Sequence, residues 1–326
     1  MKERILIVDA LNAYFRAYIV DPSLSTNGQP IGGMKGFLKI LNKLVRESKP
    51  DKIVICWDGA GGSKKRKATN KSYKEGRAPI RLNRDIRNLS ESEEITNKIW
   101  QQTRLFEYLN EMPIIQLMYE GIEADDIIAY VQQHRALQGS QKMIVSSDKD
   151  FFQLLDDETI LHRPIQKENL NRNRIIEQYG IHPNNFALAR AVVGDVSDNL
   201  PGIKGVGLGT IAKRFPFLAE EKSCTINALV KFCKENNENN LKAFTNIVEG
   251  KKLIAENYKM MQLYSPSISI QTKRDIDAIF SEFTPALNKT MIRKMFVEDG
   301  IGELSINDLF VNFKSLIYSH KEQQTT

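Results

Sequence analysis

The stretch RILIVDALN, residues 4–12, decides the fold, because a short aliphatic run ends in an aspartate and then passes into a polar, helix-compatible segment. KIVICWDG, residues 52–59, repeats this arrangement. A short apolar run of this kind is typical of a strand buried on both faces of a sheet. We therefore predict strands over Arg4–Val8 and Lys52–Cys56, each followed closely by an acid.

The chain outward from these two strands alternates between strand-like and helix-like patterns. Weaker strand candidates are Ile114–Met118, Met143–Val145 and Thr159–Leu161. Apolar residues spaced by three and four predict helices over Met34–Glu47, Glu93–Leu109 and Ala124–Leu137. This alternation predicts an α/β fold with a mainly parallel sheet flanked by helices, in which sites form outside the carboxyl ends of the strands. From about Arg172 onward the pattern is helical.

The bulk composition bounds the class of protein. The 326 residues are 41% hydrophobic and 26% charged, which is ordinary for a globular chain of one large domain or one domain plus a smaller one. No apolar run approaches the roughly 20 residues of a membrane-spanning helix, and the N-terminus lacks a signal-peptide pattern. Three cysteines without CxxC spacing and four histidines suggest neither a disulfide framework nor a zinc site. We expect a cytoplasmic protein with no membrane partner.

A basic segment over residues 63–90 interrupts the alternation. Between residues 63 and 87, ten basic residues stand against two acidic ones, an excess of +8 that exceeds the +6 of the whole chain. A charge run of this kind is compatible with a solvated or disordered loop. Its Tyr73 and its glycine and proline breaks favour a segment that contacts a polyanion.

Carboxylates follow the predicted strands or open the predicted helix that starts near residue 124. They are Asp9, Asp58, Glu123, Asp125, Asp126, Asp148 and Asp150. Singly, each fits a helix cap or a turn. Gathered at one sheet edge, they repel one another unless cations neutralise them. An oxygen-only donor set suits Mg²⁺ or Mn²⁺, and two such ions support phosphodiester hydrolysis.

A second acidic pair, Asp195 and Asp198, lies in GDVSDNLPGIKGVGLG, residues 194–209. A spacing of three on a helical turn places both acids on one side. The glycines then lead to a helix expected to start near Thr210, where main-chain N–H groups favour an anion. An ordinary turn between helices and a nucleotide-binding glycine loop are the alternatives. No strand precedes the glycines and no GKS or GKT is present, so Rossmann and P-loop sites are disfavoured.

Six motifs occur in the order of a known family. They are VDALN (8–12), WDG (57–59), SYKEGRAP (72–79), GIEADD (121–126), SSDKDFFQLL (146–155) and GDVSDNLPGIKGVG (194–207). Over about two-thirds of its length the chain resembles the 5′-nuclease family of bacteriophage 5′–3′ exonucleases, flap endonucleases and the N-terminal nuclease domain of bacterial DNA polymerase I. This resemblance implies a PIN-like sheet, a helical arch and a helix–hairpin–helix.

The resemblance also implies ligands for two Mg²⁺ or Mn²⁺ ions. The first site would be built by Asp9, Asp58, Glu123, Asp125 and Asp126. The second would be built or supported by Asp148, Asp150, Asp195 and Asp198. Residues 63–90 would form the arch or clamp, in which Lys74, Arg77 and Arg66 are the catalytic cations at the scissile phosphate.

DNA contacts are implied in the arch and in the glycine-rich hairpin, which often binds K⁺ in the family. The expected DNA-binding residues are Lys64, Lys65, Lys67, Lys71, Tyr73, Gly202, Lys204, Gly205, Gly207, Gly209 and Lys213. Packing inside the arch is an equal alternative for Tyr73. The chain departs from the family at Leu208 and Gly209, where a polar residue and a lysine are common, which puts the strength of the duplex grip in doubt.

We therefore expect a nuclease core over residues 1–170, a helix–hairpin–helix region over 171–270 and a helical extension over 271–326. The implied activity is hydrolysis of DNA at 5′ ends, flaps, nicks or forks, with RNA–DNA hybrids as a further substrate and primer removal as the setting. We expect a monomer, with a single-stranded-DNA-binding protein or clamp as a partner. The alternatives are a DNA-structure-binding protein without turnover and a PIN-like ribonuclease.

Overall fold

The computed structural model describes residues 2–76, 80–83, 85–86, 89–237, 240–302 and 304–324. Its six strands are β1 (Arg4–Asp9), β2 (Lys52–Trp57), β3 (Ile115–Met118), β4 (Gln141–Val145), β5 (Thr159–Arg163) and β6 (Glu168–Leu170). They form one sheet in the order β3-β2-β1-β4-β5-β6. All neighbouring pairs are parallel except β5 and β6.

Strand β1 lies at the centre of the sheet and sets where a site can form. It pairs with β2 on one side and with β4 on the other, in registers that align Val8 with both Ile55 and Val145. After β1 the chain adds β2 and β3 on one side of β1 within the sheet, and then adds β4, β5 and β6 on its other side. Such a reversal opens a crevice at the carboxyl ends of the two strands.

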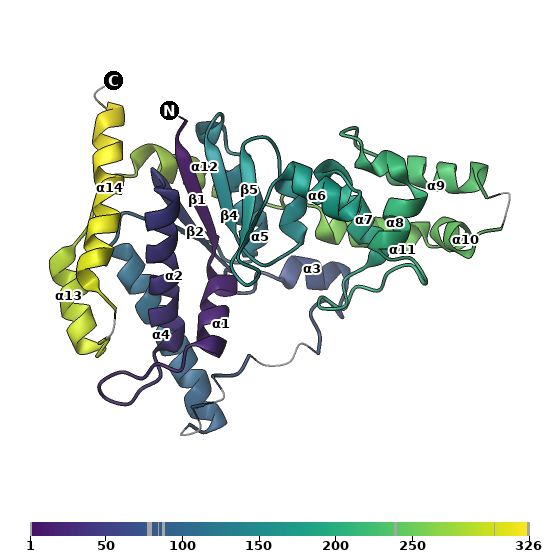
Figure 1. Ribbon diagram of the computed structural model, residues 1–326. Helices are drawn as coiled ribbons and strands as arrows, with labels where there is room; N and C mark the ends of the chain where they lie inside the picture. The colour runs from purple at the N-terminus through teal and green to yellow at the C-terminus, as the bar shows by residue number, and fades with distance from the viewer. Residues whose placement is uncertain are drawn as a thin grey trace.

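Helices cover both faces of the sheet, and the helices α6 to α11 form a body beside it (Figure 1). The α-helices are α1 (Ala10–Val20), α2 (Gly32–Ser48), α3 (Lys64–Thr69), α4 (Glu91–Asn110), α5 (Ala124–Gln132), α6 (Arg172–Tyr179), α7 (Pro183–Val193), α8 (Leu208–Arg214), α9 (Ile226–Glu235), α10 (Lys242–Glu249), α11 (Lys251–Met261), α12 (Ile270–Glu282), α13 (Lys289–Glu298) and α14 (Ile306–Gln324). The 3₁₀ turns are η1 (Arg135–Leu137), η2 (Asp150–Leu154) and η3 (Pro216–Ala219).

Two apolar cores follow from the alternation of side chains along the buried strands. On one face, Ile5 and Ile7 of β1 pack with α5, with α12 and with the body formed by α6 to α11. On the other face, Leu6 and Val8 pack with α1, α2 and α4 and with the C-terminal helices α13 and α14. Because both faces are covered, the central strands β1 and β2 are buried along nearly their whole length, as the sequence indicated.

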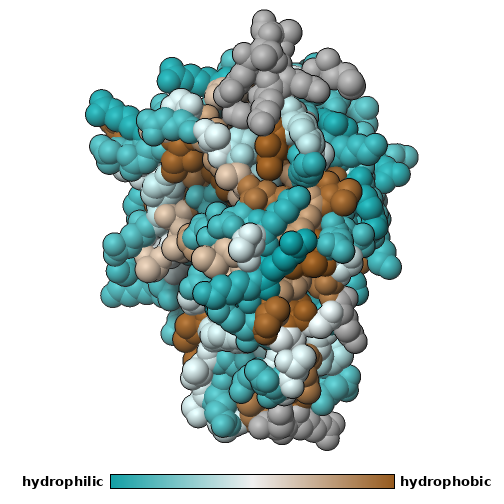
Figure 2. All heavy atoms as spheres, turned by 90° about the vertical axis from the view of Figure 1, so that its left-hand side faces the viewer, coloured by the Kyte–Doolittle hydropathy of each residue, from teal (hydrophilic) through white to brown (hydrophobic). Residues whose placement is uncertain are grey.

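The C-terminal helices α13 and α14 lie on the six-stranded sheet and not beside the α6–α11 body. Helix α14 packs against α2, and Asp299, at the end of α13, binds Arg104 and Tyr108 of α4. Figure 2 shows the outer side of these helices, where hydrophilic side chains surround scattered apolar ones. Val297 and Val311 are among the exposed apolar residues of α13 and α14. Within the described part of the chain, no helix is long and apolar enough to cross a membrane.

Several predicted elements shift, and the reason is local in each case. The predicted helix Ala124–Leu137 ends at Gln132, because His134 caps the separate turn η1 through its Nδ1. Strand β6 was not predicted. The segment with Asp195 and Asp198 is not helical: Asp195 and Leu200 exchange main-chain hydrogen bonds of 2.8 Å and close a turn.

Candidate active site

Asp9 ends β1 and caps α1 at the centre of the sheet edge. Its Oδ1 accepts a 3.2 Å hydrogen bond from the Asn12 N–H, and its Oδ2 accepts a 2.8 Å hydrogen bond from the Ser146 hydroxyl. Burial raises the pKa of Asp9 to about 7, and the nearby charges of Asp58 and Asp148 add to the rise. In the described part of the chain no lysine or arginine forms an ion pair with Asp9. Its capping role and a cation-binding role are compatible.

The end of β2 and the start of α5 meet next to Asp9. The Oδ1 of Asp58 accepts a 2.7 Å hydrogen bond from the N–H of Ala124, the first residue of α5. Asp125, on the first turn of that helix, has its pKa raised by burial and then by the charges of Asp148 and Asp9. A helix N-terminus thus places acids from two chain segments against Asp9.

Cations from the basic segment reach into this acidic group. The Glu123 carboxylate is 3% exposed; it pairs with a guanidinium nitrogen of Arg66 and lies 2.5 Å from the Lys74 Nζ. Arg66 also lies 3.1 Å from Asp126, whose other oxygen accepts a hydrogen bond from the Ser267 N–H. Arg66 is partly buried, and its acidic neighbours outweigh the desolvation that would lower its pKa.

A second acidic group lies across the crevice, after β4 and around the loop that follows α7. Burial, followed by the charge of Asp148, raises the pKa of Asp150 to about 7. Burial also raises the pKa of Asp148 itself, and Asp198 and Asp195 contribute. Burial would raise the pKa of Asp195 too, but hydrogen bonds from Ser197 and the charge of a neighbouring arginine bring it below its usual value.

That arginine is Arg190, on α7, which sequence reasoning missed. Its Nε lies 3.0 Å from Asp150, and an Nη nitrogen forms a close pair with Asp195. It therefore joins the acid after β4 to the acid after α7. The sequence signal for Arg190 was its position in the last turn of α7, five residues before Asp195. An arginine on a helix is too common for this position alone to identify it as a site residue.

The carboxylates share one crevice without closing on a common point. The charges of Asp58 and Asp148 act on Asp9, and those of Asp148 and Asp9 act on Asp125. The charges of Asp198 and Asp195 act on Asp148, and those of Asp148 and Asp195 act on Asp150. Among the residues that the structure describes, no three acidic, histidine or cysteine side chains are close enough together to enclose a metal ion. The assignment of individual ligands stays a prediction.

The basic segment is partly built into this crevice and partly exposed. Lys64, Lys65 and Lys67 of α3 and the following Lys71 are exposed. Tyr73 is different, because it is 3% exposed and packs with Leu200, Met260 and Met261. This burial favours the packing alternative, and the contact of Tyr73 with DNA stays a prediction. The predicted catalytic Arg77 lies outside the described residues.

The glycine-rich hairpin joins α7 to α8, which begins at Leu208 and not at Thr210. A Cβ on Gly202 would lie 1.7 Å from the Val193 carbonyl oxygen, so this glycine is required for close packing. Gly205 has a φ of +77°, and a Cβ on Gly205, Gly207 or Gly209 would meet open space. Lys204 and Lys213 are exposed on and after the hairpin. The hairpin therefore offers an accessible main chain beside exposed positive charge.

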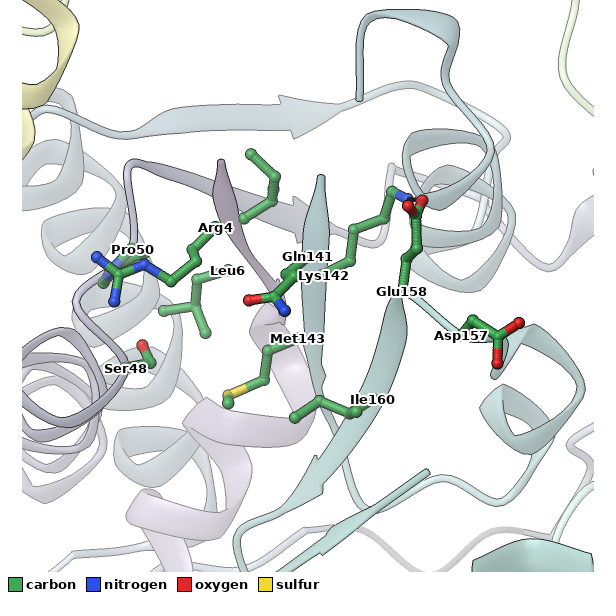
Figure 3. A pocket seen from close by; sticks show the side chains of 11 residues that line it. Arg4, Leu6, Ser48, Pro50, Gln141, Lys142, Met143, Asp157, Glu158 and Ile160 are labelled. Atoms are coloured by element: carbon green, nitrogen blue, oxygen red, sulfur yellow. Dashed lines mark ion pairs between the residues drawn. The ribbon is translucent and has the colours of Figure 1, made fainter. Parts of the chain in front are cut away.

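A further cavity, of about 210 Å³, lies at the opposite end of the strands (Figure 3). Its floor is formed by Leu6, Met143 and Ile160, and Lys142 and Glu158 form an ion pair at its rim. These residues belong to the amino-terminal halves of β1, β4 and β5 or lie just before β5. The cavity is therefore separate from the acidic crevice.

Comparisons with known proteins agree with this geometry. The family described as "5'-3' exonuclease, N-terminal resolvase-like domain" matches residues 4–180. A 5'-3' exonuclease of Buchnera aphidicola is 33% identical over 64% of this chain and 68% of its own length, and that of Aquifex aeolicus is 31% identical over 62% and 65%. The thermostable DNA polymerase I of Thermus aquaticus is 30% identical over 65% of this chain but only 24% of its own length.

Solved structures extend the likeness to nearly the whole fold. A bacteriophage T5 5'-exonuclease with bound zinc has a TM-score of 0.63 at 16% identity, covering 97% of this chain and 99% of that one. The Holliday junction-resolving enzyme GEN1, with product DNA and Mg²⁺, has a TM-score of 0.54 at 13% identity, covering 97% of this chain and 70% of that one. These likenesses show a common fold, and the family match spans more than half of the sequence. The chain therefore belongs to the 5'-3' exonuclease family.

Proposed function

We propose that the protein is a divalent-metal-dependent 5′-nuclease that hydrolyses phosphodiester bonds at 5′ ends, flaps or nicks of DNA. The observation that carries the proposal is the crevice in which carboxylates that end or follow β1, β2 and β4 lie beside those at the start of α5, where Arg66 and Lys74 bind Glu123. Family membership and DNA-bound structural neighbours support the same activity. A group of acids alone would be compatible with many metal sites. Acids next to the long cationic side chains of an arginine and a lysine are compatible with binding a phosphodiester.

The donor set fits divalent cations. Asp9 and Asp150 are buried carboxyls whose pKa values stand near 7, so a bound cation would stabilise their charged forms. Carboxylate oxygens without histidine or cysteine suit Mg²⁺ or Mn²⁺, and structural neighbours hold zinc or Mg²⁺. In the proposal two ions bind, one at each of the two acidic groups. When bound, such ions supply activation of water and stabilisation of the leaving oxygen.

The chain's own cations act on the phosphate. Arg66 is anchored by its Nε, which donates a 3.0 Å hydrogen bond to the Met260 carbonyl, and its guanidinium faces Glu123 and Asp126. Lys74 reaches Glu123 from the adjacent turn. In the proposal these two side chains exchange carboxylate oxygens for phosphate oxygens as DNA enters. Preorganised positive charge at that position stabilises the negative charge that develops in the transition state.

Duplex binding is assigned to the exposed lysines of α3 and to the hairpin. The open main chain at Gly205, Gly207 and Gly209 permits close approach of a phosphate, and a K⁺ ion there is part of the proposal. The region boundaries at residues 170 and 270, the monomeric state and a single-stranded-DNA-binding or clamp partner are proposed on the same basis. RNA–DNA hybrids are proposed as further substrates.

The test is cleavage of a 5′-labelled DNA flap in Mg²⁺ by wild-type protein, Asp148→Asn and Lys74→Ala. We expect Asp148→Asn to lose nearly all activity. Lys74→Ala should lose roughly 10²–10³-fold, as the removal of one transition-state donor does. Asp308→Asn on α14 and Lys231→Ala on α9 are exposed controls of the same residue types and should cut normally.

Each alternative predicts a distinct result. A DNA-structure-binding protein would retain the flap without cutting it in Mg²⁺. A PIN-like ribonuclease would cut single-stranded RNA of the same sequence and leave the DNA flap intact. Unimpaired cutting by Asp148→Asn would remove the support for the acidic crevice as the metal site.

A further inference from the structure

Two segments that are far apart in the sequence are joined beside the crevice by reciprocal hydrogen bonds. The N–H of Lys74 donates a 2.9 Å hydrogen bond to the carbonyl of Asp198. The side-chain amide of Asn199 donates a 3.0 Å hydrogen bond to the carbonyl of Ser72, 127 residues away. The turn of residues 70–76 is thus fastened to the loop of residues 195–200.

Both partners of this junction have a left-handed backbone. Lys74 has a φ of +56° and Asn199 a φ of +58°. Asparagine tolerates this region, whereas lysine adopts it rarely. A non-glycine residue keeps such a conformation where its surroundings hold it, so the conformation of Lys74 depends on the contacts that residues 72–74 make.

The conformation of this turn determines where the Lys74 side chain points. Its Nζ lies 2.5 Å from the Glu123 carboxylate and 4.9 Å from the centre of the Tyr73 ring. Tyr73 in turn packs against Leu200 of the same loop. A change in the loop is therefore transmitted to the position of the ammonium group.

The loop itself is rigidly built. Asp195 and Leu200 close it with two hydrogen bonds of 2.8 Å, and Arg190 of α7 binds the Asp195 carboxylate. We propose that Asn199 is a positioning residue that holds the turn of residues 70–76 so that Lys74 lies over the acidic crevice. The inference deepens the proposed function and rests on it for the role of Lys74 at the phosphate.

Two substitutions separate the amide from the backbone conformation. Asn199→Gly removes the hydrogen bond to Ser72 but adopts the left-handed backbone conformation without strain. Asn199→Ala removes the same hydrogen bond and in addition disfavours the left-handed conformation. We expect single-turnover cleavage of a saturating flap to fall about tenfold in Asn199→Gly, the effect of one lost hydrogen bond, and further in Asn199→Ala. Substrate KM should change less than twofold, because the hairpin and the α3 lysines stay in place.

The matched control is Asn184→Ala. Asn184 is also an asparagine whose amide donates to a main-chain carbonyl, that of Glu221 at 2.8 Å, but it lies away from the crevice. It should cut at the wild-type rate. A wild-type rate in Asn199→Gly, or a loss seen in KM and not in kcat, would overturn the positioning role.

A double-mutant cycle tests whether Asn199 acts through Lys74. In a Lys74→Ala background, adding Asn199→Gly should lower the single-turnover rate less than twofold, because the side chain being positioned is already absent. Full additivity of the two losses would refute the inference.

Limited trypsin digestion gives a readout that needs no DNA. Trypsin should cut after Lys71 and Lys74 several-fold faster in Asn199→Gly than in wild type or Asn184→Ala, at an unchanged unfolding temperature. Equal digestion rates would contradict the junction. If wild type failed to cut DNA while digestion still distinguished Asn199→Gly, the proposed function would fail and the structural junction would stand.

Discussion

Asp9→Asn should stabilise the metal-free protein while abolishing cleavage. Asp9 is buried at the end of β1, and the neutral amide has the size and the hydrogen-bonding positions of the protonated acid. The Asn12 N–H can still donate to the amide oxygen, and the Ser146 hydroxyl can turn to accept from the amide nitrogen. The substitution therefore removes a buried charge and keeps the local hydrogen bonds.

The magnitude follows from the pKa of Asp9, which rises from 3.8 to about 7 on folding, a difference of about 3.2 (7 − 3.8). At about 1.36 kcal/mol for each pKa unit, ionised Asp9 lowers the free energy of unfolding by up to about 4 kcal/mol. Since the folded state binds the proton more tightly, this loss is complete above pH 7 and disappears as the pH falls toward 3.8. We expect Asp9→Asn to unfold about 5–8 °C higher than wild type at pH 8.

The assay is thermal unfolding in EDTA at pH 8 and pH 5, repeated at pH 8 with excess Mg²⁺. The gain should shrink by more than half at pH 5, and Mg²⁺ should stabilise wild type far more than Asp9→Asn. Asp299→Asn is the matched control, because Asp299 is equally buried but paired with Arg104 at 2.9 Å. It should lose about 1.5–3 kcal/mol, because the amide weakens the charge-assisted hydrogen bond from Arg104, which keeps Glu107 as a partner.

A lower unfolding temperature for Asp9→Asn than for wild type at pH 8 in EDTA would refute the reasoning. So would an equal gain at both pH values, because the effect would then not come from the ionisation of Asp9.

Three further variants should change the free energy of unfolding, two by lowering it and one by raising it. Arg190→Met should cost about 3–5 kcal/mol in EDTA by leaving Asp150 and Asp195 without their cation, and Mg²⁺ should recover part of it, as unfolding curves would show. Gly202→Ala should cost about 1–3 kcal/mol through its clash with the Val193 carbonyl, measured by urea denaturation. Gly209→Ala, in open space on the first turn of α8, should gain roughly 0.5–1 kcal/mol in the same assay.

The sheet was predictable because its central strands β1 and β2 are apolar on both faces and are set off by polar residues or turns. Those signals are local, so β1, β2, β4 and β5 lie within a few residues of their predicted ranges. Strand β6 has three residues and one buried side chain, which leaves too short a pattern to detect. The turn at Asp195 escaped prediction because the spacing of three residues between Asp195 and Asp198 favours a helical turn when only the sequence is considered. In the structure, main-chain hydrogen bonds between Asp195 and Leu200 form instead.

The acids of the crevice were predictable from their places after strands, whereas their partners were not. Arg190 binds Asp150 across 40 residues, and Asn199 reaches Ser72 across 127. Pairings of this range depend on how α7 and the basic turn are packed, and no periodicity encodes them. Tyr73 illustrates the same limit, because its burial depends on Met260 and Met261, which lie in the last quarter of the chain.

The central place of β1 in the sheet has a consequence for folding during synthesis on the ribosome. Ile5 pairs with Lys142, so the first strand waits for the fourth while the intervening chain is synthesised. Until then the aspartate after β1 has no Ser146 beside it, and the acidic crevice does not exist. Contacts of such long sequence separation also slow folding. A nascent chain therefore cannot bring Asp9 and Ser146 together before roughly half of its length has emerged.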